Sequence, residues 1–444
     1  MSDTTIIQRY DTRVDLLGLS WLKPERYPFL LQSAASGPEL ARYDILFACP
    51  SETLTLNADG QLSGPATQSE AGFLANLDDW WQEQSKIETA TELPFRGGWF
   101  VYLGYELAQE IEPALKLQPN PHLPVAFATR IPVAVIYDRL LDCIDIVAEQ
   151  GHESMLAEIK QDLDQVAAMP TFTPTPAPVY AVTEEAPEQY LNAVRAAQRH
   201  ISAGDIFQAN LSRRWRARLK SQVHPVDLYA RLRETNPAPF AGLVLYPDFT
   251  LIGSSPERLV RRKGNQIDTR PIAGTRPRND AVDDIDTTRR ELLASAKDRA
   301  EHVMLIDLER NDLGRVCTPG SVQVSEFMVV ESYSHVHHIV SNISGIARDN
   351  LTPGELIRAV FPGGTITGCP KVRCMEIIQE LEGRPRTAYT GSIGFLNRNG
   401  DCDFNILIRT MMLRDDHIQV DAGSGIVADS DPQAELEETR AKAK

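Results

Sequence analysis

Stretches of strand-forming residues come in groups along this chain, and helical stretches stand between the groups rather than after every strand. Strands are predicted over residues 43–48, 98–103, 131–137, 141–147, 206–215, 242–246, 251–254, 266–271, 322–330, 337–346, 391–397 and 405–414. Helices are predicted over residues 152–168, 190–203, 287–308, 353–360 and 372–382 and after residue 431. This grouping favours an α+β fold built on antiparallel sheets.

A proline-rich segment interrupts the pattern before the midpoint. The stretch MPTFTPTPAPVYAVTEEAP, residues 169–187, contains five prolines, which favour an extended polyproline-type connection. Because the chain of 444 residues exceeds the size at which a single core usually stops growing, two domains or one large double-layered body are expected. We therefore predict an N-terminal domain over residues 1–168, a linker over 169–187 and a C-terminal domain over 188–444.

The charge balance limits the partners that this chain can take. Its formal net charge is −16, which argues against nucleic acid or an anionic membrane surface as a partner. Any anionic substrate must then be held by local cations. No apolar run is long enough to span a membrane, and the polar start MSDTTIIQRYD does not resemble a signal peptide. The six cysteines include no CxxC pair, so reduced thiols in a cytoplasmic protein are expected, without a zinc site.

The stretch DAGSGIVADSDPQAELEETRAK, residues 421–442, combines a glycine-rich turn with a charged helix. Small residues at Gly423 and Gly425 allow backbone N–H groups to approach a ligand closely. One face of the helix that follows carries Glu435, Glu438 and Lys442. This arrangement suits a metal ion and an anionic ligand, whereas the alternative is a solvated charged face that ends an ordinary domain.

Four further stretches place charged or titratable groups at turns or on regular elements. Glu257 follows a predicted strand, where a general acid or base can act. Residues 271–276, PIAGTR, predict a tight turn that could bind a ligand oxygen. Asp298 and Glu301 are three residues apart on a predicted helix, so their oxygens point the same way. Arg409, in the apolar run ILIRT, would be partly buried and would need an anionic partner.

Each of these side chains also has a purely structural explanation, as a turn residue, a solvated helix position or half of an ion pair. His338, on a predicted strand, could likewise be a satisfied core histidine. Taken together, Glu301 and Glu438 offer the carboxylate oxygens that Mg²⁺ binds in proteins. The residues alone therefore predict an Mg²⁺-dependent enzyme acting on a small anionic substrate.

The same stretches resemble the chorismate-utilising enzymes, a family that includes anthranilate, aminodeoxychorismate, isochorismate and salicylate synthases. The matching strings are SPERLV (255–260), PIAGTRPR (271–278), DRAEHVMLIDLERNDLGRV (298–316), SHVHHIVS (334–341), FPGGTITGCPKVRCMEIIQELE (361–382), YTGSIGF (389–395), ILIRT (406–410) and GSGIVADSDPQAELEET (423–439). The N-terminal half is similar to the family in LLQS (30–33), RYDIL (42–46) and GGWFVYLGYELAQEIE (97–112). The resemblance implies two large antiparallel β-sheets packed as a sandwich and flanked by helices, with both halves of the chain in both sheets.

The resemblance also implies a role for each candidate residue. Mg²⁺ would be bound by Glu301 and Glu438, with Glu435 and Asp298 completing the metal shell. The enolpyruvyl carboxylate of chorismate would contact Arg409, Tyr389, Gly423, Gly425 and Lys442. Gly274 and Thr275 would line the ring pocket, Gln208 would contact the substrate, and Ala273 and Thr275 would stand at catalytic positions. Glu257 would be the general acid beside the leaving C4 hydroxyl, and His338 would lie close to the ring. A catalytically inactive homologue would lack the metal ligands or the arginine, and all of them are present.

Local features indicate which branch of the family the chain resembles. Gln208 stands where the isochorismate and salicylate branch carries a lysine that activates water, so ammonia is the expected nucleophile. The strings QANLS (208–212), NPAPF (236–240), FPGGTIT (361–367) and NILIR (405–409) are similar to the aminodeoxychorismate branch. The expected reaction is amination of chorismate to 4-amino-4-deoxychorismate, with ammonia from a separate glutamine amidotransferase subunit.

Ala273 points to a different member of the family. The aminodeoxychorismate branch often carries a lysine here that attacks C2 of chorismate, whereas an alanine cannot be a nucleophile and is typical of anthranilate synthases. The alternative prediction is therefore anthranilate synthase component I, which eliminates pyruvate itself. By resemblance, a tryptophan site is also predicted at Leu31, Ser33, Tyr43, Pro239 and Phe240, although Gln32 departs from the glutamate of tryptophan-regulated enzymes.

Overall fold

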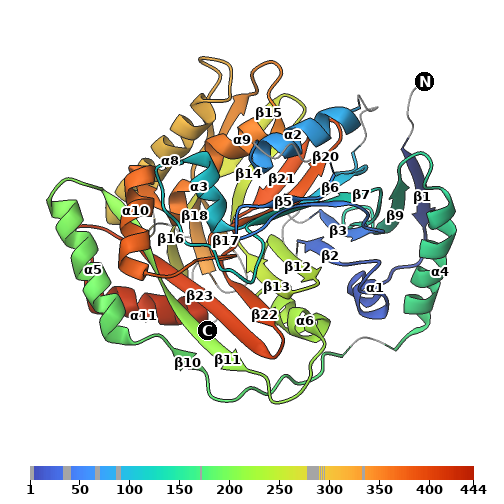
Figure 1. The fold of residues 1–444 in the computed structure, drawn as a ribbon, viewed down its shortest axis with the longest axis horizontal. Coiled ribbons are helices and arrows are strands. Elements are labelled where there is room, and N and C mark those ends of the chain that lie inside the picture. The colour runs from blue at the N-terminus through green and yellow to red at the C-terminus, as the bar shows by residue number, and fades with distance from the viewer. Residues whose placement is uncertain are drawn as a thin grey trace.

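Two large antiparallel sheets organise the computed structural model (Figure 1). It describes residues 5–33, 42–65, 71–86, 92–170, 173–277, 290, 292, 294, 296–332 and 336–444, with the backbone alone at 275–277, 296–298 and 336. Within these residues, one sheet has 12 strands and the other has 11. The predicted α+β class with two large antiparallel sheets is confirmed.

Each sheet contains strands from the part of the chain before the proline-rich segment and from the part after it. The 12-stranded sheet has the order β1 (Ile6–Tyr10), β9 (Cys143–Ala148), β8 (Val133–Asp138), β3 (Tyr43–Ala48), β2 (Phe29–Gln32), β12 (Phe240–Tyr246), β13 (Phe249–Ser255), β22 (Thr410–Arg414), β23 (His417–Ile426), β11 (Gln208–Arg218) and β10 (Thr183–Glu184), with β19 (Gly368–Cys369) also paired to β11. The other has the order β16 (Ile272–Pro277), β18 (Val336–Ile346), β15 (Gln266–Arg270), β14 (Arg258–Lys263), β21 (Cys402–Asn405), β20 (Ser392–Asn397), β6 (Gly98–Leu103), β7 (Ala126–Ile131), β4 (Thr53–Leu56) and β5 (Leu62–Ser63), with β17 (Gln323–Ser332) paired to β18. The two halves of the chain meet where β2 pairs with β12 and where β6 pairs with β20.

An aromatic layer fills the space between the two sheets. Phe29 of β2 stacks on Phe100 of β6 with ring centroids 4.2 Å apart, and Phe47 of β3 meets the same Phe100 ring edge-on at 5.3 Å. Phe127 of β7 stacks on Tyr246 of β12 at 4.4 Å. Each such pair stabilises the fold by about 0.5–1.5 kcal/mol beyond the burial of its surface. These aromatic contacts join the inner faces of the two sheets.

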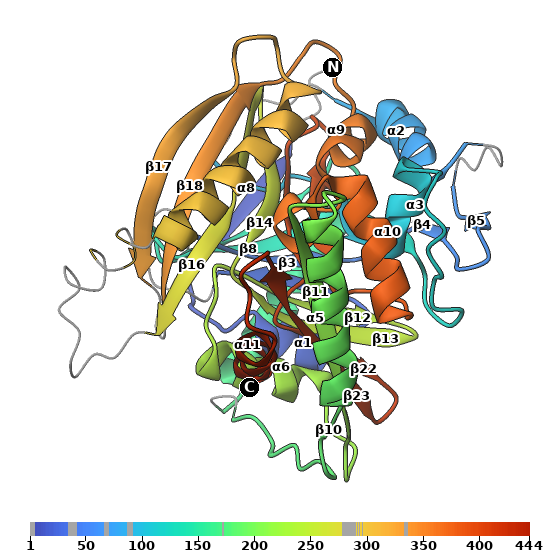
Figure 2. The same ribbon diagram turned by 90° about the vertical axis from the view of Figure 1, so that its left-hand side faces the viewer.

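Helices cover the outer faces of both sheets, as Figures 1 and 2 show. The 11-stranded sheet is covered by α2 (Phe73–Gln84), α8 (Ala296–Gly314) and α9 (Pro353–Val360). The 12-stranded sheet is covered by α1 (Leu17–Leu22), α4 (Ser154–Ala168) and α6 (Pro225–Thr235), and around β11 by α5 (Pro187–Ser202), α10 (Lys371–Glu382) and α11 (Pro432–Ala443). Short turns η1 (Tyr105–Leu107), α3 (Ala108–Ile111) and η2 (Gly364–Ile366) complete the described elements.

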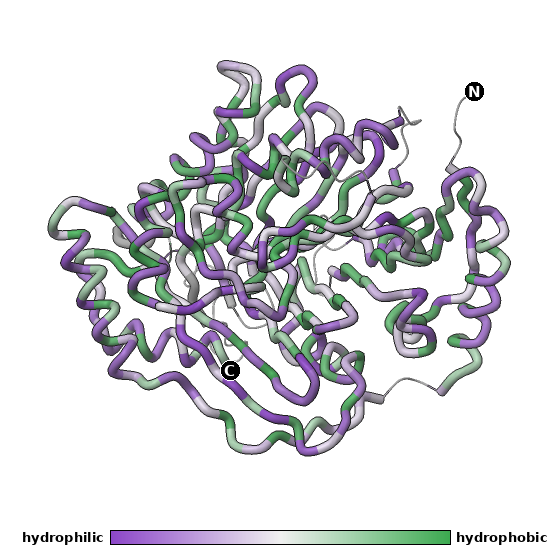
Figure 3. Tube along the Cα trace, in the orientation of Figure 1, coloured by the Kyte–Doolittle hydropathy of each residue, from purple (hydrophilic) through white to green (hydrophobic). Residues whose placement is uncertain are grey.

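Apolar residues gather along the central strands, and polar residues mark the outer helices (Figure 3). None of the described helices is long and apolar enough to cross a membrane.

The chain changes sheets at short links between consecutive strands, and these links account for two corrections. The single strand predicted over 131–137 is two strands in different sheets, separated by Pro132, which has no N–H for a ladder bond. The strand predicted over 405–414 is likewise broken at 406–409, between β21 and β22.

Three other predictions of local structure were wrong. Gly423 and Gly425 lie inside strand β23 rather than in a turn, because β11 pairs with them along its length. The stretch PIAGTR forms most of strand β16 rather than a tight turn. The helix predicted to end at residue 308 continues to Gly314, and its predicted start lies outside the described residues.

Candidate active site

Two links between the sheets place the main charged groups side by side. Glu257 lies in the link between β13 and β14, and Arg409 lies in the link between β21 and β22. The backbone N–H of Ile406 donates to the Glu257 carbonyl at 3.0 Å, and the N–H of Ser254 donates to the Arg409 carbonyl at 3.1 Å. The two links at which the chain passes from one sheet to the other therefore hold an acidic and a cationic residue next to each other.

Arg409 is held in an unusual backbone conformation. Its φ of +51° is left-handed, which is uncommon for a residue with a side chain and is concentrated at functional sites. Its guanidinium forms no hydrogen bond or ion pair with any residue that the structure describes. Burial lowers its pKa, and the nearby charge of Glu257 opposes that change. The purely structural explanation was that Arg409 is half of an ion pair within the protein. No residue of the described chain forms that pair.

Glu257 is a buried acid poised near neutrality. Only 5% of its surface is exposed, and this burial raises its pKa to about 7. The Thr365 hydroxyl, the backbone N–H of Ile272 and the positive charges of Lys442 and Arg409 oppose the rise. The Thr365 hydroxyl faces the carboxyl without forming a well-aligned hydrogen bond. At neutral pH the carboxyl is therefore populated in both protonation states.

His338 lies in the same charged region. It is 2% exposed on β18, where its backbone pairs with Thr275 of β16. Burial lowers its pKa to about 3, and the charges of Arg409 and Lys442 act in the same direction. The imidazole is therefore neutral at physiological pH. The neighbouring His337 instead has its Nδ1 2.8 Å from the Ser332 hydroxyl.

A glycine allows strand β16 to bulge beside His338. The register between β16 and β18 shifts between Ala273 and Thr275, and Gly274 between them has a φ of +68°. Glycine adopts this conformation without the steric cost that a Cβ atom brings. Ala273 is half-buried on the same strand, and the Thr275 side chain lies outside the described part.

The glycines of β23 make room for two polar side chains. A methyl group on Gly423 would lie 2.6 Å from the Tyr389 hydroxyl, and one on Gly425 would lie 2.5 Å from Nε2 of Gln208. Burial raises the pKa of Tyr389 to about 12, so its hydroxyl remains a donor at neutral pH. Gln208 is 7% exposed, and its Oε1 accepts no hydrogen bond from the described residues.

Helix α11 closes over this strand. Asp431 caps the helix by accepting from the N–H of Ala434 at 2.8 Å. Glu435 is 7% exposed and accepts from the Ser430 hydroxyl at 2.7 Å. The Lys442 ammonium donates to the Gly423 carbonyl at 3.0 Å and pairs with Glu438 at 2.7 Å. Because the charge of Lys442 also acts on the pKa values of Glu257 and His338, this helix belongs to the same site.

The predicted magnesium ligands lie on two helices, α8 and α11. Glu301 is half-buried on α8, Glu435 and Glu438 lie on α11, and the Asp298 side chain is outside the described part. All four are hard oxygen donors, which is the chemistry that Mg²⁺ requires. Among the described side chains, no three metal-binding groups form a ready cluster. The magnesium site stays a prediction.

A separate cavity of about 310 Å³ contains all five residues predicted to bind tryptophan. These are Leu31, Ser33, Tyr43, Pro239 and Phe240. Gln32 lines it too, but its amide donates to Asp44 at 2.9 Å and accepts from Tyr229 at 3.2 Å. The predicted residues are thus brought together, and tryptophan binding itself stays a prediction.

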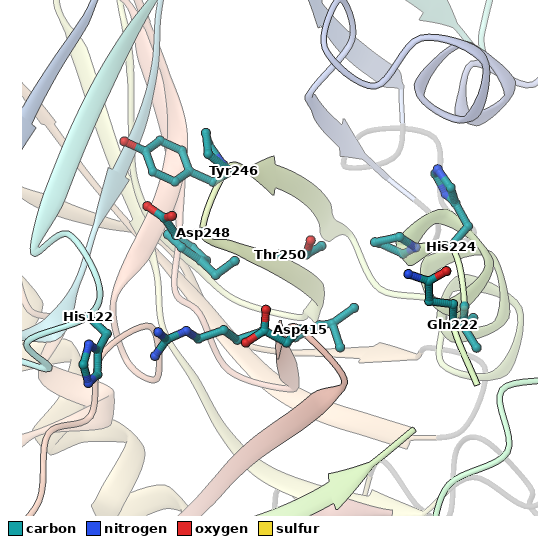
Figure 4. A pocket seen from close by; sticks show the side chains of 13 residues that line it. His122, Gln222, His224, Tyr246, Asp248, Thr250 and Asp415 are labelled. Atoms are coloured by element: carbon teal, nitrogen blue, oxygen red, sulfur yellow. The ribbon is translucent and has the colours of Figure 1, made fainter. Parts of the chain in front are cut away.

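A larger hollow of about 560 Å³ lies elsewhere, near the start of α6 (Figure 4). His224, Asp248 and Asp415 are among its lining residues. None of the predicted site residues lines it.

Sequence reasoning missed Thr365 and Asn210. Thr365 was inside a quoted string, but only the η2 turn shows that its hydroxyl faces Glu257. Asn210 lies two residues after Gln208 on β11, and its Oδ1 and the Tyr389 hydroxyl both border Gly423, so strand alternation could have indicated that Gln208 and Asn210 face one side.

The links between the two sheets thus bring together a protonatable acid, an arginine and a glycine-bearing strand, an arrangement whose chemistry suits a small anion. Residues 28–444 match the family of chorismate binding enzymes, so the chain belongs to that family.

Two relatives and one solved structure extend this finding. The chain is 38% identical to an "anthranilate synthase component I-like protein" of Synechocystis over 96% of this chain and 86% of the relative. It is 42% identical to "aminodeoxychorismate synthase component 1" of Bacillus subtilis over 82% of this chain and 79% of the relative. The crystal structure of anthranilate synthase component I from Streptococcus pneumoniae superposes with a TM-score of 0.81 at 32% identity, covering 92% of each chain.

Proposed function

We propose that this chain is the synthase subunit of a two-component aminodeoxychorismate synthase. It would aminate chorismate to 4-amino-4-deoxychorismate with ammonia from a glutaminase partner. The observation that carries the amination is the buried amide of Gln208 beside Gly425. An amide cannot deprotonate water, but its Oε1, which has no partner in the described chain, can accept an N–H of ammonia.

The grip on substrate follows from the charges. Chorismate carries two carboxylates, and a protein with a net charge of −16 must hold them with local groups. Arg409 forms no direct ion pair in the described chain, so an enolpyruvyl carboxylate would satisfy it, with the Tyr389 hydroxyl as a second donor. Gly423 and Gly425 leave space for that group against β23.

Glu257 would move the proton that the reaction needs. Its pKa of about 7 keeps part of the population protonated at neutral pH. The protonated carboxyl would donate to the C4 hydroxyl oxygen as that group leaves, and Thr365 would orient the carboxyl. His338 is neutral, so it would border the ring without adding a second charge.

Glu301, Glu438, Glu435 and Asp298 would hold Mg²⁺. When bound, the ion supplies positive charge to the ring carboxylate and the leaving oxygen. Lys442, which pairs with Glu438, would orient the Glu438 carboxylate.

Three observations bear on the choice of product. The strings QANLS, NPAPF, FPGGTIT and NILIR support amination at C4. Gln32 is neutral and already bonded to Asp44 and Tyr229, which supports a synthase that tryptophan does not regulate tightly. Ala273 favours the second candidate, anthranilate synthase component I, because its methyl group cannot attack C2.

The partner subunit follows from the source of ammonia. Both relatives described above carry "component I" or "component 1" in their names, which supports a second subunit. A glutaminase that releases ammonia into the pocket would meet the Gln208 amide.

Product analysis tests the proposal directly. The purified chain, incubated with chorismate, Mg²⁺ and ammonium, should form 4-amino-4-deoxychorismate, identified by chromatography with and without an added lyase. Fluorescent anthranilate as the main product would overturn the first candidate in favour of the second.

Glu438→Gln tests the metal assignment within the same assay. It should abolish Mg²⁺-dependent turnover while the chain remains folded, and near-normal activity would refute the role of Glu438. Gln433→Glu, at another exposed position of the same helix, is the matched control and should keep wild-type turnover.

A further inference from the structure

Arg386 lies behind the candidate active site with its hydrogen-bonding capacity fully used. Its side chain is 1% exposed. Nε and Nη2 donate to the two oxygens of Glu382 at 3.0 and 2.6 Å. Nη1 donates to the Ile366 carbonyl at 3.2 Å and the Thr390 hydroxyl at 3.4 Å, and Nη2 also donates to the Asn210 carbonyl at 2.6 Å. All five guanidinium N–H groups are thus accounted for.

Glu382 holds the other side of this ion pair in place. Its Oε1 accepts from the backbone N–H and the hydroxyl of Ser212, both at 2.9 Å. Burial alone would raise the pKa of Glu382, but the charges of Arg386 and Arg384 leave it lowered. The pair is therefore ionised, bidentate and anchored to strand β11.

Two tyrosines sandwich the guanidinium region. The Arg386 carbon Cζ lies 5.0 Å from the ring centroid of Tyr105 and 5.4 Å from that of Tyr389. Tyr105 belongs to the N-terminal half, whose Glu106 also accepts from the Arg386 backbone N–H at 2.8 Å. The face of the Tyr389 ring is thus supported by Arg386, and its hydroxyl borders Gly423 together with Oδ1 of Asn210.

The partners of Arg386 are the immediate neighbours of groups in the active site. Oδ1 of Asn210 and the Tyr389 hydroxyl both lie beside Gly423, Ile366 follows Thr365, and Thr390 follows Tyr389. We infer that Arg386 is a positioning residue for substrate binding. Its one planar guanidinium sets the relative positions of three walls of the pocket, namely β11 at Asn210, η2 at Ile366 and the segment at Thr390. It would not touch the substrate. This inference rests on the proposed function only for the identity of the pocket.

A fork of five donors is needed for this task. Lysine keeps the charge but offers three donors around a single point, so it cannot bond Glu382 bidentately and reach both carbonyls as well. In Arg386→Lys we expect KM for chorismate to rise about 10- to 100-fold while kcat falls less than about 10-fold, because the walls shift but Glu257 does not.

Arg384→Lys is the matched control. Arg384 also pairs with an acid, Asp421, at 3.1 Å, and donates to the Ser212 hydroxyl at 3.0 Å, but it bonds no wall of the pocket. Because Arg384 bonds neither Ile366, Asn210 nor Thr390, the KM of this variant should stay within about threefold of wild type. Both variants are compared by urea unfolding, so that a loss of stability is measured separately from the change in KM.

A double-mutant cycle separates positioning from general support. If Arg386 acts through Tyr389, the effects of Arg386→Lys and Tyr389→Phe on KM must be less than additive. Additive effects, or an unchanged KM in Arg386→Lys, would overturn the inference. If Arg386→Lys does not fold, Glu382→Gln replaces it in the same cycle, and an unchanged KM there overturns the inference as well. Formation of anthranilate by the wild type would refute the proposed product, yet these KM comparisons would still decide the role of Arg386.

Discussion

The candidate active site and the cavity lined by Phe240 contain consecutive residues of the chain, yet their arginines are compensated in opposite ways. Glu257 faces the active site, and Arg258 lines the cavity of about 310 Å³. In the cavity, Arg258 is paired with Asp403 through bonds of 2.9 and 3.1 Å and lies 4.8 Å from the ring centroid of Phe240. In the active site, Arg409 has no ion pair within the described chain.

This difference distinguishes a site that requires a charged ligand from one that does not. Removing a buried charge from water is costly unless a partner compensates for it. Arg258 is compensated within the protein, so an occupant of the cavity need bring no charge. Arg409 and the nearby Lys442 act on Glu257 through space only, which leaves room for an anionic ligand to complete the set.

The largest effects are expected when Arg409 and Arg258 are each replaced by methionine. Arg409→Met should lower kcat/KM by about a thousandfold, because a charge-assisted contact to substrate is lost, with stability equal to or above wild type. Arg258→Met should instead destabilise the fold by about 1–3 kcal/mol, because Asp403 loses its partner, with kcat/KM changed less than about tenfold. Steady-state kinetics and urea unfolding measure both. If the two variants lose the same property, the contrast is wrong.

The next effect concerns the acid in the active site. Glu257→Gln should reduce kcat by about 10²- to 10⁴-fold, since an amide cannot donate the proton as an acid does. In the wild type, kcat should fall as pH rises through about 7, where the raised pKa of Glu257 is passed. The pH–rate profile of the variant should lack this descending limb, and its persistence would assign it to another group.

Glu309 on α8 is a buried acid near Glu257, and replacing it should have a smaller effect, on stability. Burial raises its pKa to about 8, and the charges of Asp312 and Glu257 act in the same direction. Because the folded state then binds more protons than the unfolded state between pH 4.5 and 8, this contribution to stability is lost as pH rises through that window. Glu309→Gln should therefore gain about 1–3 kcal/mol over wild type at pH 8 relative to pH 4.5. Urea unfolding checks this, with the exposed Glu380→Gln as a control; an equal gain at both pH values would contradict it.

The smallest effect belongs to the cavity. L-tryptophan should bind with a Kd of about 0.1–1 mM, because Gln32 is neutral and its amide is already bonded within the protein. Phe240→Ala should remove the binding, as measured by titration calorimetry. Submicromolar binding, or binding that survives this substitution, would show that the cavity is built differently from this account.

Sequence reasoning reached the fold class, because strand patterning and local strings are properties of short segments. Its candidate site residues stay predictions, although the structure brings Glu257, Arg409 and Lys442 near one another. It failed where the outcome depended on distant segments. Arg409 was placed inside a strand, since nothing in ILIRT shows that the chain turns into the other sheet there. The glycines of β23 were read as a turn, although pairing with β11 makes them strand. Arg386 was missed altogether, because its partners come from four separate segments of the chain.

The seams between β2 and β12 and between β6 and β20 make the two halves of this molecule inseparable partners. Residues 29–32 pair with 241–244, and residues 98–103 pair with 392–397. A polypeptide cut once in the stretch 169–187 would remain interlocked along both seams. Either piece expressed alone would instead expose two unpaired strand edges and half of the aromatic layer. It would aggregate rather than act as a smaller enzyme.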